Sequence, residues 1–119
     1  MGTVTAHLYG ISNCDKMRKT LSWFKLHNID MIYHDYKKEG VDMPALEKAL
    51  LAHGAEGIIN KRGTTWKKLP DDVKSSLSEQ TAAKIACENP SVIKRPLILY
   101  GDDVIIGFDE SELLKHFDV

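Results

Sequence analysis

Cys14 lies where a strand pattern ends and a helical pattern begins, which is a place that suits a nucleophilic cysteine. Residues from Thr3 to Leu8 alternate between polar and apolar side chains, and apolar residues recur at helical spacing from Met17 to Leu26. The first turn of a helix has free N–H groups and the positive end of the helix dipole, which stabilise an anion by about 0.3–1 kcal/mol. The sequence therefore predicts a thiolate nucleophile at Cys14.

A fully ionised thiol needs a further positive charge, and two arginines in short basic clusters could supply it. Arg62 lies in one cluster and Arg95 in the other. We expect both side chains to help hold a small anion beside Cys14. The alternative is that they are solvated surface residues, as most arginines are.

The other residues that could react or bind have simpler interpretations. Cys87 follows alanines in a helical stretch, so we expect it to be a structural core residue. The five histidines have no metal-ligand spacing, so no metal site is predicted. Trp23 and Trp66 are expected to be packing residues, because a large ring gains most from burial.

The length and composition predict a single domain over residues 1–119, which is long enough to bury a core without disulfides. With 16 basic and 17 acidic residues the net charge is -1, which favours neither nucleic acid nor a membrane as a partner. No apolar run approaches the roughly 18 residues of a membrane span. The two cysteines form no disulfide framework, and the N-terminus lacks the pattern of a signal peptide, so a reducing cytoplasm is expected.

The pattern of elements predicts an α/β protein. The chain begins βαβα, with a second strand near residues 31–36 and a helix capped by Asp42 that stops at Gly54. Residues 55–74 suggest irregular backbone, and a helix follows from about residue 78 to 87. The chain ends ββα, because a turn at Gly101 joins two apolar runs and Asp109 begins a capping box.

These elements together predict a thioredoxin-like arrangement: a mixed sheet of about four strands covered by helices, with a helical insertion. In such an arrangement the loop after the first strand opens at the edge of the sheet. Cys14 would then lie at the N-terminal end of the first helix.

Three segments, "YGISNCDKMRKTLSW", "NKRGTTWKKL" and "NPSVIKRPL", together resemble the glutaredoxin-linked arsenate reductase (ArsC/Spx) family, in particular its YffB-like branch. The resemblance covers essentially the whole chain. It implies a thioredoxin-like fold with a helical insertion and a catalytic cysteine that matches Cys14. It also implies an arginine before a proline that is often cis, matching Arg95 and Pro96, and a basic residue matching Arg62 or the adjacent Lys61.

Three positions depart from the patterns of that family. Arsenate-reducing members carry a histidine where this chain has Gly10, and a further arginine in the neighbourhood of Phe108. A trianionic oxyanion would therefore meet fewer cations. The Spx-type regulators, which bind RNA polymerase, use a C-x-x-C switch, but Met17 occupies the place of its second cysteine.

The resemblance implies a glutathione-dependent thiol-disulfide reductase with a single nucleophilic cysteine and no bound cofactor. Glutathione is the expected co-substrate, and glutathione or a glutaredoxin would supply the resolving thiol. Two alternatives remain open. One is a non-enzymatic, protein-binding regulator of the Spx type, and the other is an arsenate reductase.

Overall fold

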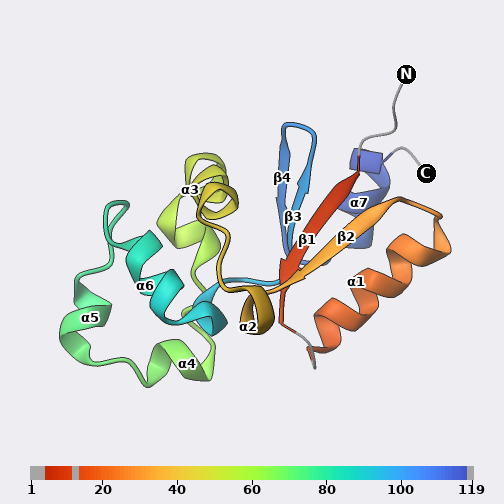
Figure 1. Ribbon diagram of the computed structural model, residues 1–119. Helices are drawn as coiled ribbons and strands as arrows, with labels where there is room; N and C mark the ends of the chain where they lie inside the picture. Colours follow the sequence, from red (N-terminus) through yellow and green to blue (C-terminus); the bar gives the residue numbers. More distant parts are fainter. Residues whose placement is uncertain (1–4, 12–13, 118–119) are drawn as a thin grey trace. The chain divides into compact units, whose positions relative to one another are not determined.

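The computed structural model describes residues 5–11 and 14–117 (Figure 1). The chain forms two compact units, one made of Met1–His34 with Arg95–Val119 and the other of Asp35–Lys94. The second unit is thus inserted into the first along the chain, which agrees with the expected helical insertion. The assignment of residues 1–119 to a single domain stays a prediction.

The first unit contains a four-stranded sheet in the order β2-β1-β3-β4. β3 is antiparallel to both of its neighbours, with Tyr9 opposite Leu97 and Leu97 opposite Ile106. Figure 1 shows β1 and β2 running in the same direction, so the sheet is mixed, as predicted. The elements are β1 (Ala6–Gly10), α1 (Asp15–Leu26), β2 (Met31–Asp35), β3 (Leu97–Tyr100), β4 (Asp103–Ile106) and α7 (Glu110–Phe117).

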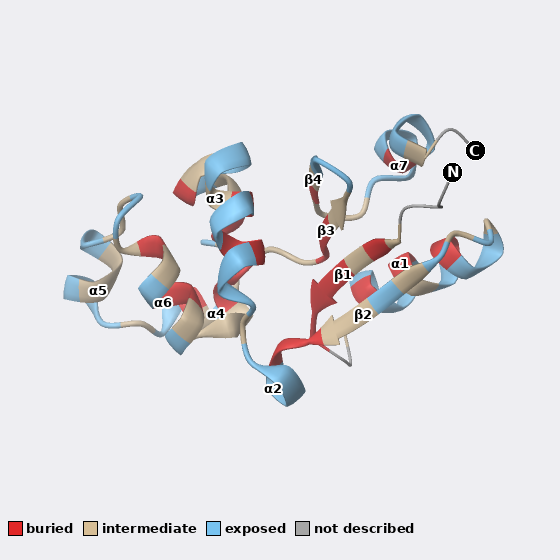
Figure 2. Cartoon of the chain, turned by 45° about the horizontal axis from the view of Figure 1, so that its top comes forward, coloured by how far each residue is buried: buried red, intermediate tan, exposed pale blue. Residues whose placement is uncertain are grey.

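The core of the first unit lies between one face of the sheet and the helices α1 and α7. Alternate residues of a strand point to opposite faces, so one set from each strand enters this core. Figure 2 shows how much of β1 is buried. Trp23 is 6% exposed, in agreement with its predicted packing role. The buried cluster consists of Ala6, Leu8, Trp23, Phe24, Ile98, Ile105 and Leu113.

The predicted N-caps and turns are confirmed. Asp42 Oδ1 accepts a hydrogen bond from the Ala45 N–H at 3.2 Å, and Asp109 Oδ1 accepts one from the Ser111 N–H at 2.9 Å. An N-cap of this kind stabilises a helix by about 1 kcal/mol. Gly101, in the turn of the β3–β4 hairpin, has a φ of 59°, a conformation that glycine adopts without steric cost.

The second unit is helical and corrects two boundaries drawn from the sequence. Residues 55–74 are less irregular than expected, because they include two short helices. The helix expected from about residue 78 begins at Ala82, while Gly54, with a φ of 74°, interrupts α3 where its end was predicted. The elements are α2 (Tyr36–Glu39), α3 (Met43–Ile58), α4 (Thr64–Lys67), α5 (Asp71–Ser75), α6 (Ala82–Glu88) and the 3₁₀ helix η1 (Pro90–Val92).

Within residues 5–11 and 14–117, no helix combines the length and the apolar character that crossing a membrane requires.

Candidate active site

Cys14 is the N-cap residue of α1, as the sequence pattern predicts. Its backbone is extended, with a φ of -111° and a ψ of 127°, and its carbonyl accepts the Arg18 N–H at 3.0 Å. Its side chain is partly exposed and makes no capping hydrogen bond to the helix. The thiol therefore lies at the positive end of a 12-residue helix and is not committed to holding that helix together.

Arg18 adds a cation one helical turn after Cys14, and this residue was not predicted from the sequence. Residues four apart lie on the same face of a helix, so the spacing from Cys14 to Arg18 was the available signal. Arg18 forms an ion pair with Asp15, the acidic residue next to the cysteine. Both side chains are exposed, so the pair contributes little stability, but it offsets the negative charge closest to the thiol.

Arg95 and Pro96 reach the same end of the sheet as Cys14. Because β1 and β3 are antiparallel with Tyr9 opposite Leu97, the residues just before β3 lie beside the residues that follow Tyr9. The Arg95–Pro96 bond is cis, as the resemblance suggested, and the Pro96 carbonyl accepts the Gly107 N–H at 2.8 Å.

The Arg95 side chain is half-buried. Among the residues that the structure describes, its guanidinium has no ion-pair partner and makes no hydrogen bond to Cys14. The structure therefore brings Arg95 to the same end of the sheet as Cys14 without joining the two side chains directly. A role for Arg95 in holding an anion beside the thiol stays a prediction.

Arg62 belongs to the second unit, where it lies in a turn before α4. Its N–H donates to Asn60 Oδ1 at 3.1 Å, and its side chain is exposed. The adjacent Lys61 is engaged, because its Nζ lies 2.7 Å from Glu56 Oε1 and 5.8 Å from the centre of the Trp66 ring. Of the two cations that the resemblance left open, Arg62 is thus the one without an ion pair in the described part of the chain. Its approach to Cys14 stays a prediction.

Gly10 and Met17, two of the departures from the family patterns, are in direct contact. Met17 is 1% exposed, and its side chain fills the space beside Gly10 at the end of β1. A Cβ atom on Gly10 would lie 2.9 Å from Met17 Cε and still closer to Met17 Sδ. A histidine at position 10 is therefore incompatible with the present position of the Met17 side chain.

Cys87 lies on α6 and is intermediate in exposure, so the expectation that it belongs to the buried core is wrong. Burial raises the pKa of the Cys87 thiol, and the neighbouring Glu88 carboxylate raises it further. Its Sγ is in contact with Met43 Sδ, at the start of α3. Since the thiolate is the reactive form, Cys87 is poorly placed to be a nucleophile at neutral pH.

Among the residues that the structure describes, no three or more histidine, cysteine or acidic side chains are grouped so that they could hold a metal ion. His7 and His34 do form a pair on β1 and β2, with Nδ1 and Nε2 3.0 Å apart. Two ligands alone do not make a structural zinc site, which uses four.

Comparisons with known proteins agree with the sequence resemblance. The family model for the ArsC family matches residues 9–116. An uncharacterized protein from Haemophilus influenzae is 45% identical over 110 residues, 92% of this chain and 96% of that protein. The global transcriptional regulator Spx of Streptococcus agalactiae is 31% identical over 103 residues, 85% of this chain and 74% of the regulator. A solved structure of a YffB protein has a TM-score of 0.89 and 34% identity, covering 92% of this chain and 96% of that one.

The contact between Gly10 and Met17 can be tested by a double-mutant cycle. Gly10→Ala should lower the free energy of unfolding by about 1–2 kcal/mol, because the added methyl group overpacks the site. Met17→Ala removes the crowding atoms, so in that background Gly10→Ala should lower the free energy of unfolding by less. The difference should be at least about 0.5 kcal/mol, which is the lower end of the coupling energies found for residues in contact. Urea denaturation of the four proteins measures both values. Additive effects would contradict the contact.

The two cysteines should differ in reactivity. At pH 7 we expect iodoacetamide to modify Cys14 faster than Cys87, because the raised pKa of Cys87 leaves less of that thiol as thiolate. Timed alkylation followed by peptide mass spectrometry gives both rates. Cys14→Ser should remove the fast reaction and Cys87→Ser the slow one. Equal rates at the two positions would contradict the assignment of the nucleophile.

Proposed function

Because this chain belongs to the ArsC family, we propose that it is a glutathione-dependent thiol-disulfide reductase with Cys14 as its nucleophile. The observation that carries the proposal is the position of the Cys14 thiol. It lies at the first turn of α1, it makes no capping bond, and it shares one end of the sheet with Arg95 and Pro96.

The proposed reaction consists of two thiol-disulfide exchanges. The Cys14 thiolate attacks the glutathione sulfur of a mixed disulfide, forms a bond to it and displaces the other thiol, which takes a proton from solvent. A glutathione thiolate then attacks the glutathione sulfur bound to Cys14. Oxidised glutathione leaves, and the Cys14 thiolate is restored. The sulfur of the displaced thiol is reduced, and one glutathione thiol is oxidised, because the other half of the oxidised glutathione comes from the mixed disulfide.

Arg95 is proposed to bind a carboxylate of glutathione, because its planar guanidinium can donate two parallel hydrogen bonds. The backbone before β3 is proposed to pair with the peptide part of glutathione. Arg62 is proposed to add a second cation. Pro96 holds the segment in place through its hydrogen bond to Gly107. The reaction needs no bound cofactor, and it belongs in a reducing, cytoplasmic compartment where glutathione or a glutaredoxin supplies the resolving thiol.

A protein-binding regulator is the second candidate, and the identity with Spx favours it. The residue at the third position after Cys14 weighs against a C-x-x-C redox switch of the Spx type. Met17 is buried there against Gly10, so Cys14 has no neighbouring thiol with which to form a local disulfide.

Turnover of the mixed disulfide of glutathione and 2-mercaptoethanol tests the proposal. Cys14→Ser should abolish turnover, while Cys87→Ser should retain it. Arg95→Lys keeps the charge but loses one of two hydrogen bonds, so kcat/KM should fall about tenfold, the equivalent of about 1.4 kcal/mol. Oxidation of glutathione, coupled to glutathione reductase, is the measurement. Full turnover in Cys14→Ser would refute the proposal.

Arsenate should be a poor substrate, with kcat/KM about 100-fold below that for the mixed disulfide. The physical reason is the lack of positive charge at position 108, where Phe108 is half-buried against the core. Phe108→Arg should lower the KM for arsenate several-fold, because an added guanidinium attracts the oxyanion. Comparable rates for the two substrates in the unaltered protein would favour the arsenate reductase alternative.

A further inference from the structure

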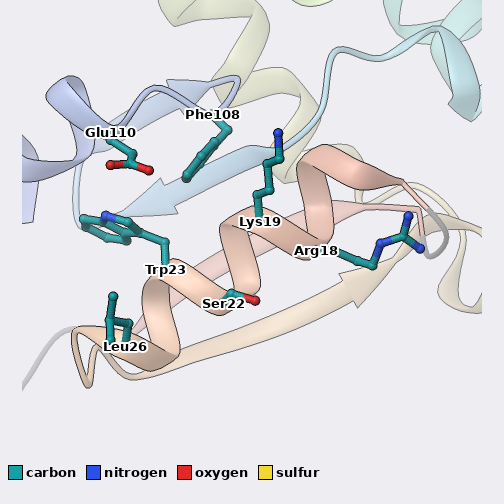
Figure 3. Close-up of a pocket in the computed structure, with 7 residues that line it drawn as sticks. All are labelled: Arg18, Lys19, Ser22, Trp23, Leu26, Phe108 and Glu110. Atoms are coloured by element: carbon teal, nitrogen blue, oxygen red, sulfur yellow. The ribbon is translucent and has the colours of Figure 1, made fainter.

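A groove lies between α1 and the segment that joins β4 to α7, within the first unit. Its volume is about 480 Å³, which is in the range of small-molecule sites. α1 forms one side, and the segment between β4 and the first turn of α7 forms the other (Figure 3). We call it the α1 groove, and its lining residues are Arg18, Lys19, Ser22, Trp23, Leu26, Phe108 and Glu110.

The α1 groove has an apolar centre. Trp23 is 6% exposed, and its ring is fixed by contacts with Phe24 and Phe117, at centroid distances of 5.3 and 5.9 Å. Phe108 contributes a second aromatic ring from the opposite side. Leu26 is 76% exposed, although its spacing had placed it on the apolar face of the helix. An apolar ligand in the groove would therefore contact a rigid ring and cover an otherwise exposed leucine.

The charges around this centre are unequal. Lys19 extends from the middle of the groove wall and has no ion-pair partner among the described residues (Figure 3). Arg18, which is paired with Asp15, lies at the end nearest the start of α1. Glu110 is the one acidic residue of the lining. A ligand with one carboxylate would therefore be attracted to Lys19, while Glu110 would disfavour a second anionic group near it.

The groove begins close to the proposed nucleophile. Arg18 follows Cys14 by four residues, which corresponds to about 6 Å along a helix axis. Trp23 follows Cys14 by nine residues, about 13.5 Å along the axis, which a small thiol cannot span. Phe108 lies nearer, because the neighbouring Gly107 N–H donates to the Pro96 carbonyl at the end of the sheet that holds Cys14. A thiol held against Phe108 and Lys19 could therefore extend its sulfur toward the start of α1. None of the groove residues is among those assigned to glutathione.

We propose that the α1 groove binds the half of the disulfide substrate that is not glutathione, and that this half is a small thiol with an aromatic group and one carboxylate. This assignment rests on the proposed function. The ring packs against Phe108, at the end of the groove nearer Cys14, and the carboxylate pairs with Lys19. When the Cys14 thiolate bonds to the glutathione sulfur, the groove-bound thiolate leaves, takes a proton from solvent and departs as the reduced product.

Binding can be tested without any thiol chemistry. The probe is 4-phenylbutyrate, and the signal is Trp23 fluorescence in a Trp66→Phe variant. The indole N–H resonance of Trp23 in the unaltered chain is a second readout, should Trp66→Phe fold poorly. We expect saturable binding that is at least fivefold tighter than that of butyrate, which lacks the ring, or 4-phenylbutylamine, which reverses the charge. Equal affinity for the three probes, or no binding, would overturn the proposal.

Charge reversal on α1 supplies a matched pair of variants. Lys19→Glu should weaken 4-phenylbutyrate binding at least fivefold. Lys25→Glu makes the same change at an exposed position of α1 outside the groove and should leave binding unaltered. Equal effects of the two substitutions would show a general charge effect and overturn the role of Lys19. Binding of the peptide acetyl-Glu-Phe-Glu-amide more tightly than 4-phenylbutyrate would assign the groove to a protein segment instead.

Substrate selectivity tests the link to catalysis. Three mixed disulfides of glutathione, which differ only in the groove-binding half, can be compared. Their second thiols are 2-mercapto-3-phenylpropionate, 3-mercaptopropionate and 2-phenylethanethiol. We expect kcat/KM to be at least fivefold higher for the first, and Lys19→Glu to reduce that preference. Equal turnover of all three would overturn the proposal. If none is turned over while 4-phenylbutyrate still binds as expected, the proposed function fails, and the groove stands as a site for aromatic acids.

Discussion

The pairing of β1 with β3 is the interaction on which the first unit depends. It joins residues 6–10 to residues 97–100, and the whole second unit lies between them in the sequence. The entropy of closing a loop grows only slowly with its length, so an insertion of this size adds little to the cost of the pairing. The same pairing fixes one end of the sheet, where the chain turns from β1 toward Cys14 and enters β3 from Arg95 and Pro96. Loss of that register would separate the nucleophile from its proposed anion-binding partners.

Features determined by a few neighbouring residues could be predicted from the sequence. The caps at Asp42 and Asp109, the turn at Gly101 and the helix start at Cys14 each follow from local hydrogen bonding or backbone preference. The mixed sheet followed from the order of these elements. The resemblance supplied the cis bond before Pro96, which no local pattern predicts.

Features that depend on distant packing could not be predicted in this way. Helical spacing placed Leu26 on the apolar face of α1, but the described core ends before it, and the side chain is exposed. The contact between Gly10 and Met17 joins the end of a strand to a helix, and nothing in the type of either residue indicates the other as its neighbour. The α1 groove is formed by α1 together with Phe108 and Glu110, which follow α1 by more than 80 residues in the sequence. Short helices such as α4 and α5 lack the length over which periodicity becomes visible.

Met17 is buried at the third position after Cys14, so the site has one cysteine and not two. This difference changes how oxidation of the site would depend on the concentrations of reduced and oxidised glutathione. A site with two cysteines exchanges with two glutathione molecules, so its oxidised fraction varies with the concentration of oxidised glutathione divided by the square of the reduced concentration. A site with one cysteine exchanges with a single molecule, and the modified fraction then depends on the ratio of oxidised to reduced glutathione alone. Under the proposed chemistry, dilution or expansion of the pool at a constant ratio would leave Cys14 unchanged, whereas a two-cysteine site would respond to it.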